Sequence, residues 1–359
     1  MKHKGLWMTF ACLLLICTNA IPTPACGSSD YLVRDNTGTT RVLLTLTGDC
    51  VLGGEEKARK SERSFDSVIA GKGMEWPFSG LNEIFSRDDI TLVNLEGVLQ
   101  DHTKGRLTTK QYTFRGTAAY TKVLQLGSVE QVNIANNHYI DYGKTGRDST
   151  REALSAAGIP FSGFQELSVA EIRGRKIGFG GIRETVYRQD KKIMTRDIEK
   201  LKEMGCDAIV YSCHFGKEYS RTHNALQEKM ARQAIDLGAN LVVGHHPHVV
   251  QGVESYNGGV ILYSLGNFVF GGNLDLTEFD GCVAQAEFIW KEEEYEGVQI
   301  RLIPVLTTGA APDNDFRPGL AKGEDKDRIL QKMQEDSVIP LSETMYFPAQ
   351  NKISAEDEK

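Results

Sequence analysis

The sequence lacks the features that would place it quickly in several large classes of protein. It contains no block of basic residues, and its formal net charge is -7, so a nucleic-acid partner is not expected. It shows no internal repeat and no CxxC pair. No apolar run reaches the roughly 20 residues that a transmembrane helix requires. Hydrophobic residues make up 40% of the 359 residues and charged residues 25%, proportions that are typical of globular proteins.

Residues 1–25 have the order of an export signal. Lys2 and Lys4 precede the apolar run "GLWMTFACLLLICT", and small residues follow it. Two cleavage sites remain open: release after Ala20, or a lipoprotein box "PAC" with Cys26 as the lipidated residue. We therefore expect a bacterial protein of the cell envelope, either secreted or anchored in the membrane as a lipoprotein.

The cysteines leave the redox question open. Of seven in the chain, two lie in the leader and Cys26 is the lipidation candidate. Cys50, Cys206, Cys213 and Cys282 remain. They predict either a disulfide, which an oxidising compartment permits, or buried free thiols.

The rest of the chain reads as one α/β domain between short flanking segments. A linker occupies residues 26–40, the domain residues 41–310, and a polar helix with an acidic tail residues 311–359. Within the domain, apolar strands such as "RVLLTLT" and "DAIVYSCHF" alternate with helices of ten to fifteen residues, for example "HNALQEKMARQAIDLG". This alternation indicates a largely parallel sheet. The segment "PFSGLNEIFSRDD" predicts a further helix.

Polar side chains follow strand after strand at the carboxyl ends, where the sites of α/β proteins gather. They are Asp49, Asn94, Glu96, Asn136, Asn137, His138, His214, His245, His246 and His248. Taken singly, each is explained as a cap, a turn residue or a core histidine. Together, carboxylates, an amide oxygen and imidazoles form a ligand set for Mn, Fe or Zn. The sequence therefore predicts a divalent-metal site at one rim.

Several of these motifs resemble one family. In order, they are "TLTGDCVLGG", "LVNLEGVL", "IANNHYIDYG", "GIPFSGF", "SCHFGKEY", "GHHPHVVQGVE" and "LYSLGNFVF". Together they look like the CapA family of poly-gamma-glutamate or capsule synthesis proteins, within the calcineurin-like metallophosphoesterase superfamily. The resemblance implies a four-layer sandwich of two mixed β-sheets flanked by helices, with two metal ions at one edge.

The resemblance also implies a role for each matching residue. Asp49 would bind the first metal, Glu96 would bridge the two, and Asn137 would bind the second. His138 would be the catalytic acid. The further ligands would be His214, His246 and His248, with His245 as a competitor for the place of His246.

This chain departs from the superfamily at two positions. Phosphatases of the superfamily usually read Asp-x-His at the first strand, whereas Asp49 is followed by Cys50 and Val51. Glu96 also replaces a shorter bridging aspartate. Both changes are similar to the CapA family's own pattern, but they put a conventional two-metal phosphatase reaction in doubt.

Three functions follow. The first is an exported metal-dependent hydrolase that acts on an anionic envelope polymer or a phosphoester. The second is a non-catalytic accessory or anchoring component of a membrane complex for polymer synthesis and export. The third is a secreted protein that scavenges metal.

The geometry of the histidine loop can also be predicted. Alternate side chains of an extended segment point to opposite faces, and Pro247 favours an extended His246. We therefore expect His246 and His248 to point into the site and His245 to pack away from it. Asn267, at the next strand end, is the candidate support for a ligand ring.

Overall fold

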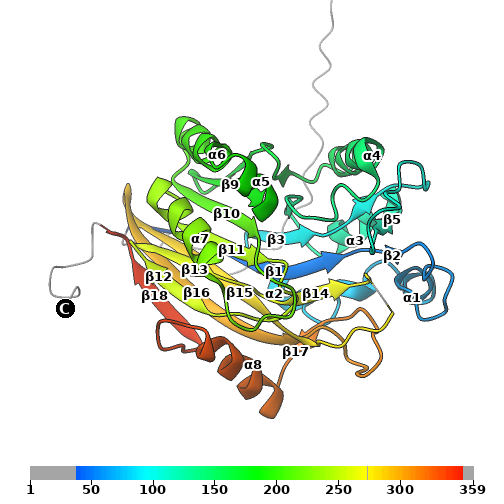
Figure 1. Cartoon of the computed structure of the whole chain (residues 1–359). Coiled ribbons are helices and arrows are strands. Elements are labelled where there is room, and N and C mark those ends of the chain that lie inside the picture. Colours follow the sequence, from blue (N-terminus) through cyan, green and yellow to red (C-terminus); the bar gives the residue numbers. More distant parts are fainter. Residues whose placement is uncertain (1–37, 273, 351–359) are drawn as a thin grey trace, which may run out of the picture. The chain divides into compact units, whose positions relative to one another are not determined.

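The computed structural model describes residues 38–272 and 274–350, so the predicted export signal and Cys26 lie outside the described residues. All described residues belong to one unit, Arg34–Lys359. Its two large sheets each contain parallel and antiparallel neighbours, as predicted (Figure 1). None of the helices in the described ranges is long and apolar enough to cross a membrane.

The first sheet has β1 near its centre, parallel to β3 on one side; on the other side it pairs with the antiparallel β15 and, near its end, with the parallel β14. Its strand order is β17-β16-β15-β1-β3-β6-β7, and β14 and β18 pair with β1 and β16. The strands are β1 (Thr39–Val51), β3 (Ile90–Leu95), β6 (Gln131–Asn133), β7 (Phe161–Ser162), β14 (Asn267–Phe270), β15 (Asp280–Lys291), β16 (Glu294–Leu306), β17 (Gly319–Leu320) and β18 (Thr344–Pro348).

The second sheet has the order β12-β13-β11-β10-β9-β8. Its strands are β8 (Ser168–Ile172), β9 (Arg175–Arg183), β10 (Ala208–His214), β11 (Leu241–His245), β12 (Val253–Tyr256) and β13 (Gly259–Leu262). A small third sheet contains β2 (Gly54–Glu55), β4 (Val98–Leu99) and β5 (Phe114–Gly116).

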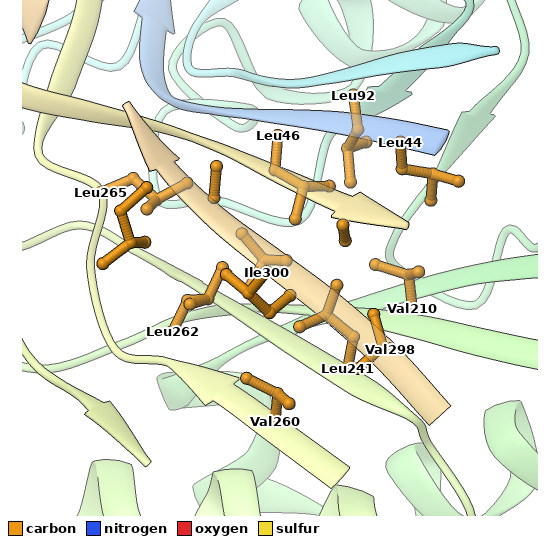
Figure 2. Close-up of a cluster of buried hydrophobic side chains, with 14 of the residues drawn as sticks. Leu44, Leu46, Leu92, Val210, Leu241, Val260, Leu262, Leu265, Val298 and Ile300 are labelled. Atoms are coloured by element: carbon orange, nitrogen blue, oxygen red, sulfur yellow. The ribbon is translucent and has the colours of Figure 1, made fainter. Parts of the chain in front are cut away.

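The two large sheets face one another across a common apolar core. Leu44, Leu46 and Leu92 of the first sheet share this core with Val210 and Leu241 of the second (Figure 2). Because these strands are buried on both faces, they read as continuous apolar runs.

Helices cover the outer faces of both sheets. Those beside the first sheet are α1 (Phe65–Lys72), η1 (Trp76–Phe78), α2 (Asn82–Phe85), η2 (Ala118–Tyr120), α3 (Thr121–Leu126) and α4 (Gly143–Ala156). Those beside the second are α5 (Glu184–Gln189), α6 (Lys192–Glu203) and α7 (Ala225–Leu237). This arrangement confirms the predicted four-layer sandwich.

The C-terminal part of the described chain packs into this sandwich. The polar helix α8 (Glu324–Glu335) places Ile329 and Met333 in the core between the sheets. The carboxylate of Asp336, just after α8, accepts hydrogen bonds from the backbone N–H groups of Gly252 and His223. The strand β18 was not predicted.

The four cysteines among the described residues are all free. Cys50, Cys213 and Cys282 are buried, and Cys206 is partly buried. Of the two alternatives for these four residues, the structure therefore shows free thiols.

Candidate metal centre

Two rows of polar side chains face one another where the strands of the two large sheets end. In the first sheet, Asp49 is in register with Asn94 of β3 and with Asn267 of β14. In the second sheet, His214 of β10 is in register with His245 of β11. The rows approach closely, since His245 Nδ1 lies 3.5 Å from Asp49 Oδ1.

Asp49 is completely buried but well provided with donors. Its Oδ1 accepts a hydrogen bond from Asn94 Nδ2 at 2.8 Å, and its Oδ2 accepts one from the backbone N–H of His246 at 3.1 Å. Burial opposes ionisation, but the nearby imidazoles of His245 and His248 outweigh it and lower the pKa of Asp49 well below its usual range. The carboxylate is therefore negatively charged.

Glu96 is equally buried, but neither of its carboxylate oxygens has a hydrogen-bond partner among the described residues. Nearby imidazole atoms are His214 Nε2 at 3.6 Å and His138 Nε2 at 3.9 Å from Oε1. Burial, reinforced by the charge of Asp49, raises the pKa of Glu96 well above its usual range. An unpaired buried carboxylate costs several kcal/mol unless a cation compensates it. This position therefore suits a bound cation.

The prediction that His245 packs away from the site is wrong. Along β11, Leu241 and Val243 point into the core between the sheets, so alternation sends His245 to the same inward face. His246 then has φ 99° and His248 φ 58°. These left-handed conformations end the extended segment and return both rings to the site, so all three histidines gather there.

Asn267 supports His248 as predicted. Its Oδ1 accepts a hydrogen bond from His248 Nδ1 at 3.0 Å, and Asp49 Oδ2 lies 3.1 Å from the same nitrogen. Burial opposes protonation of His248, but the carboxylates of Glu96 and Asp49 raise its pKa to about 9. With Nδ1 engaged, Nε2 is the ring atom that remains for a metal, which would displace its proton on binding.

His214 and His246 have the opposite electrostatic environment. Burial, helped by the neighbouring imidazoles, lowers the pKa of His214 well below its usual range and that of His246 to about 4. Their ring centroids are 4.7 Å apart. Neutral imidazoles of this kind are ready to bind a metal, because a ligand nitrogen must be deprotonated.

The polar residues of the loop after β6 have two roles: one links neighbouring strands, and another faces the candidate site. Asn136 Nδ2 donates to Asn94 Oδ1 and to the carbonyl of Leu95, so it fastens β6 to β3. The partly exposed Asn137 instead directs Oδ1 to within 2.8 Å of His214 Nε2. Asn137 therefore belongs to the site, as predicted.

His138 is held by groups that the sequence analysis did not identify. Its Nδ1 lies 2.7 Å from Asp141 Oδ2, and its ring stacks on Phe114 at 4.0 Å between centroids. Asp141 also pairs with Lys110, which donates to the carbonyl of Asn137 as well. Burial lowers the pKa of His138 in spite of Asp141. The neutral ring therefore leaves Nε2 free to accept a proton.

Three groups of side chains have ligand atoms close enough to share one ion. They are Asp49, Glu96 and His248; Glu96, His214 and His246; and Glu218, His246 and His248. Glu96 belongs to the first two groups, which is the arrangement expected of a carboxylate between two ions. Glu218 is exposed and was missed, although it lies in the quoted motif "SCHFGKEY", because nothing in its spacing marks it as a ligand. The structure thus brings all seven predicted site residues together.

Comparisons with known proteins agree with these motifs. Residues 43–272 match the family model described as bacterial capsule synthesis protein PGA_cap. The chain is 31% identical over 229 residues to the PGA biosynthesis protein CapA of Bacillus subtilis (strain 168), an alignment that covers 58% of this chain and 60% of that protein. It is 27% identical over 255 residues to the capsule biosynthesis protein CapA of Bacillus anthracis, covering 64% of this chain and 60% of that one.

The chain therefore spans about three fifths of the length of these curated relatives. Among solved structures, TT1561 of Thermus thermophilus has a TM-score of 0.37 and 10% sequence identity, covering 68% of this chain and 94% of that one. That TM-score is too low to relate the two folds in detail.

Proposed function

This chain belongs to the bacterial capsule synthesis protein family, and from that premise we propose that it is a divalent-metal-dependent hydrolase of phosphoesterase type. We place its reaction in the synthesis of capsule or poly-gamma-glutamate in the cell envelope. One observation carries the proposal: Glu96 is a fully buried carboxylate without a hydrogen bond, close to the neutral imidazoles of His138 and His214.

The residues present fit a pair of divalent ions. One ion would be held by Asp49, Glu96 and His248, and the other by Glu96, His214 and His246, with Asn137 Oδ1 beside the second group. Carboxylate oxygens and imidazole nitrogens suit Mn, Fe or Zn. Bound ions would supply charge neutralisation and Lewis-acid polarisation for a phosphoryl group.

His138 handles the proton in this proposal. Asp141 fixes the ring through Nδ1, so Nε2 is directed toward Glu96, 3.9 Å away. Because the resting ring is neutral, Nε2 takes up a proton before it can give one to a leaving oxygen. The predicted role as an acid thus begins with His138 as a proton acceptor.

The proposal includes location and partners. The predicted export signal and the lipidation candidate Cys26 support an envelope protein, secreted or lipid-anchored, that meets an anionic polymer or a phosphoester there. A membrane complex for polymer synthesis would be its protein partner, and no nucleic acid is involved.

Metal analysis and hydrolysis assays test the proposal together. The purified protein is loaded with Mn, Fe or Zn and assayed with bis(p-nitrophenyl) phosphate. We expect turnover that requires the metal and that disappears in His248→Ala. Absence of bound metal, with no loss of activity or stability in that variant, would overturn the proposal.

A second function is favoured by one observation at the first strand. Cys50 and Val51 are completely buried, so the position where phosphatases of the superfamily carry a histidine offers no imidazole. A non-catalytic accessory role in a polymer-assembly complex fits this difference. It requires that the protein does not turn over substrate, so metal-dependent hydrolysis of the phosphodiester would count against it. A metal scavenger would take up metal tightly without hydrolysis.

A further inference from the structure

We propose that Arg183 binds an anionic oxygen of the substrate, phosphoryl or carboxylate, beside the metal centre. The inference deepens the proposed function and rests on it for the presence of a substrate at this rim. Arg183 is the last residue of β9, and neither the sequence motifs nor the family resemblance marked it.

The register of the second sheet places Arg183 in the same row as the histidines. Arg183 pairs with His214, and His214 pairs with His245. Ile177 and Phe179 of β9 lie in the core between the sheets. Since side chains alternate along a strand, Arg183 shares their face and extends it at the rim.

The register that places Arg183 beside His214 agrees with the electrostatic interactions of its guanidinium. Together with burial and His248, the charge of Arg183 lowers the pKa of His246. Burial lowers the pKa of Arg183 itself, and the carboxylate of Asp141 partly opposes this. Arg183 is therefore within range of a candidate ligand on one side and of the His138 support on the other.

Arg183 has no hydrogen-bond or ion-pair partner for its guanidinium within residues 38–272 and 274–350, although carboxylates are near. Asp141 is occupied by Lys110, His138 and the backbone N–H of Phe114. Glu184 accepts from the N–H of Gly216 through Oε2 and from Arg188 through Oε1. The five N–H donors of Arg183 thus remain available.

The position of Arg183 is nevertheless fixed. Its backbone is held in the sheet by β10, and the bond from Gly216 to Glu184, at 2.9 Å, ties the residue after Arg183 to the segment after His214. The side chain is partly buried. A preorganised guanidinium loses little freedom on binding and matches the two oxygens of a phosphoryl or carboxylate group.

The negative charge of the protein explains why a guanidinium at this position would favour binding of an anionic substrate. Bound metal ions would offset the carboxylates of the candidate metal groups, but the chain as a whole carries a formal net charge of -7. An anionic substrate is repelled by such surroundings unless a cation receives it locally.

Anion titration of purified variants tests the inference. Inorganic phosphate and, separately, acetate are titrated calorimetrically into Mn-loaded and metal-free protein. We expect Arg183→Gln to weaken the preferred anion about 10- to 100-fold, as the loss of charged hydrogen bonds predicts. Arg183→Lys should fall between, because it keeps the charge without the fork. The control Arg196→Gln removes an exposed arginine paired with Asp190 and should change nothing.

The two anions identify the substrate group: Arg183-dependent binding of phosphate indicates a phosphoryl group and that of acetate a carboxylate. Equal affinity of wild type and Arg183→Gln for both anions, or no binding of either by the wild type, overturns the inference. The proposed function fails separately. If the protein takes up no metal, or turns over no phosphodiester, Arg183-dependent anion binding still stands. Metal content should be equal in all variants.

Discussion

Glu96 and Glu254 are both buried glutamates, but only one has partners. Glu254 accepts from Arg232 Nε at 2.7 Å and from the hydroxyl of Tyr263 at 2.5 Å, whereas Glu96 accepts from no described residue. The paired carboxylate of Glu254 is typical of a structural residue. The unpaired carboxylate of Glu96 is typical of a residue that binds a cation. Substitution by glutamine separates the two roles, because it removes the charge and preserves the shape.

We expect Glu96→Gln to stabilise the metal-free protein at neutral pH by about 1–3 kcal/mol, because burial raises the pKa of the Glu96 carboxyl, whereas the amide cannot ionise. The same variant should hold less metal and gain less stability from it. Urea unfolding with and without EDTA, together with elemental analysis, measures both effects.

The matched variant Glu254→Gln should behave in the opposite way. It removes one side of an ion pair, so we expect a loss of about 1–3 kcal/mol with unchanged metal content. Unchanged metal content in Glu96→Gln would instead make Glu96 a structural residue.

His246 provides a second test at this scale. Its Nδ1 is buried without a hydrogen bond, and it belongs to two candidate ligand groups. We expect His246→Ala to lower the affinity for metal about tenfold or more. His223→Ala is the control, because His223 is bound to Asp336 and stacked on Tyr263. Equal metal affinity in the two variants would exclude His246 as a ligand.

The site residues at strand ends could be predicted from the sequence, because an apolar run followed by a polar side chain is enough to recognise them. Asp49, Glu96 and His214 were found in this way. His245 was misplaced because the rule of alternation needs the parity of β11, which only the packed core defines. Lys110 and Arg183 were missed, since their roles arise from tertiary contacts that leave no motif.

Among the elements, long amphipathic segments were predicted best. The predicted helix "HNALQEKMARQAIDLG" corresponds to α7, which begins with a capping box between Asn224 and Gln227 and ends at Gly238. The helix expected in "PFSGLNEIFSRDD" is instead divided into η1 and α2. Gly80 lies between them, where an added Cβ would be 2.1 Å from the carbonyl oxygen of Pro318. That close approach is invisible in the sequence.

The contact of α6 with β10 contains a buried carboxyl group whose titration can be measured. Asp197 accepts a hydrogen bond from the hydroxyl of Tyr211 at 2.8 Å, and burial raises the pKa of Asp197 to about 6. A raised carboxyl pKa stabilises the fold at low pH, and this stability is lost as the pH rises from about 4 through 6.

We therefore expect Asp197→Asn to match the wild type at pH 4 and to exceed its free energy of unfolding by about 1–3 kcal/mol at pH 8. The amide oxygen still accepts from Tyr211 but cannot ionise. Urea unfolding across this pH range measures the difference. A constant difference at all pH values would show that Asp197 is not the titrating group.

At the scale of the whole molecule, the segment that matches the family model is shorter than the segment that forms the fold. The match ends at residue 272, but β15 lies directly beside β1, and β16 lies beyond it. Ala284, Phe288 and Ile300 of these strands belong to the core between the sheets. The matched segment therefore lacks a large part of its own core.

We expect a chain that ends at Gly272 to be insoluble or unfolded, because removal of β15 exposes one edge of β1 and the apolar face beneath it. Circular dichroism and thermal unfolding of the shortened and full-length chains measure this. A cooperative transition in the shortened chain would contradict the expectation.

The pairing of β1 with β15 also has a consequence for the time course of folding. Thr39 is in register with Lys291, and Leu46 with Ala284. The antiparallel partner of β1 is therefore a strand that lies more than two hundred residues further along the chain. Closing so long a loop costs conformational entropy before any contact repays it, and a high contact order slows folding. The antiparallel side of β1 therefore stays unpaired until the chain through Lys291 is available, so the first large sheet is completed late.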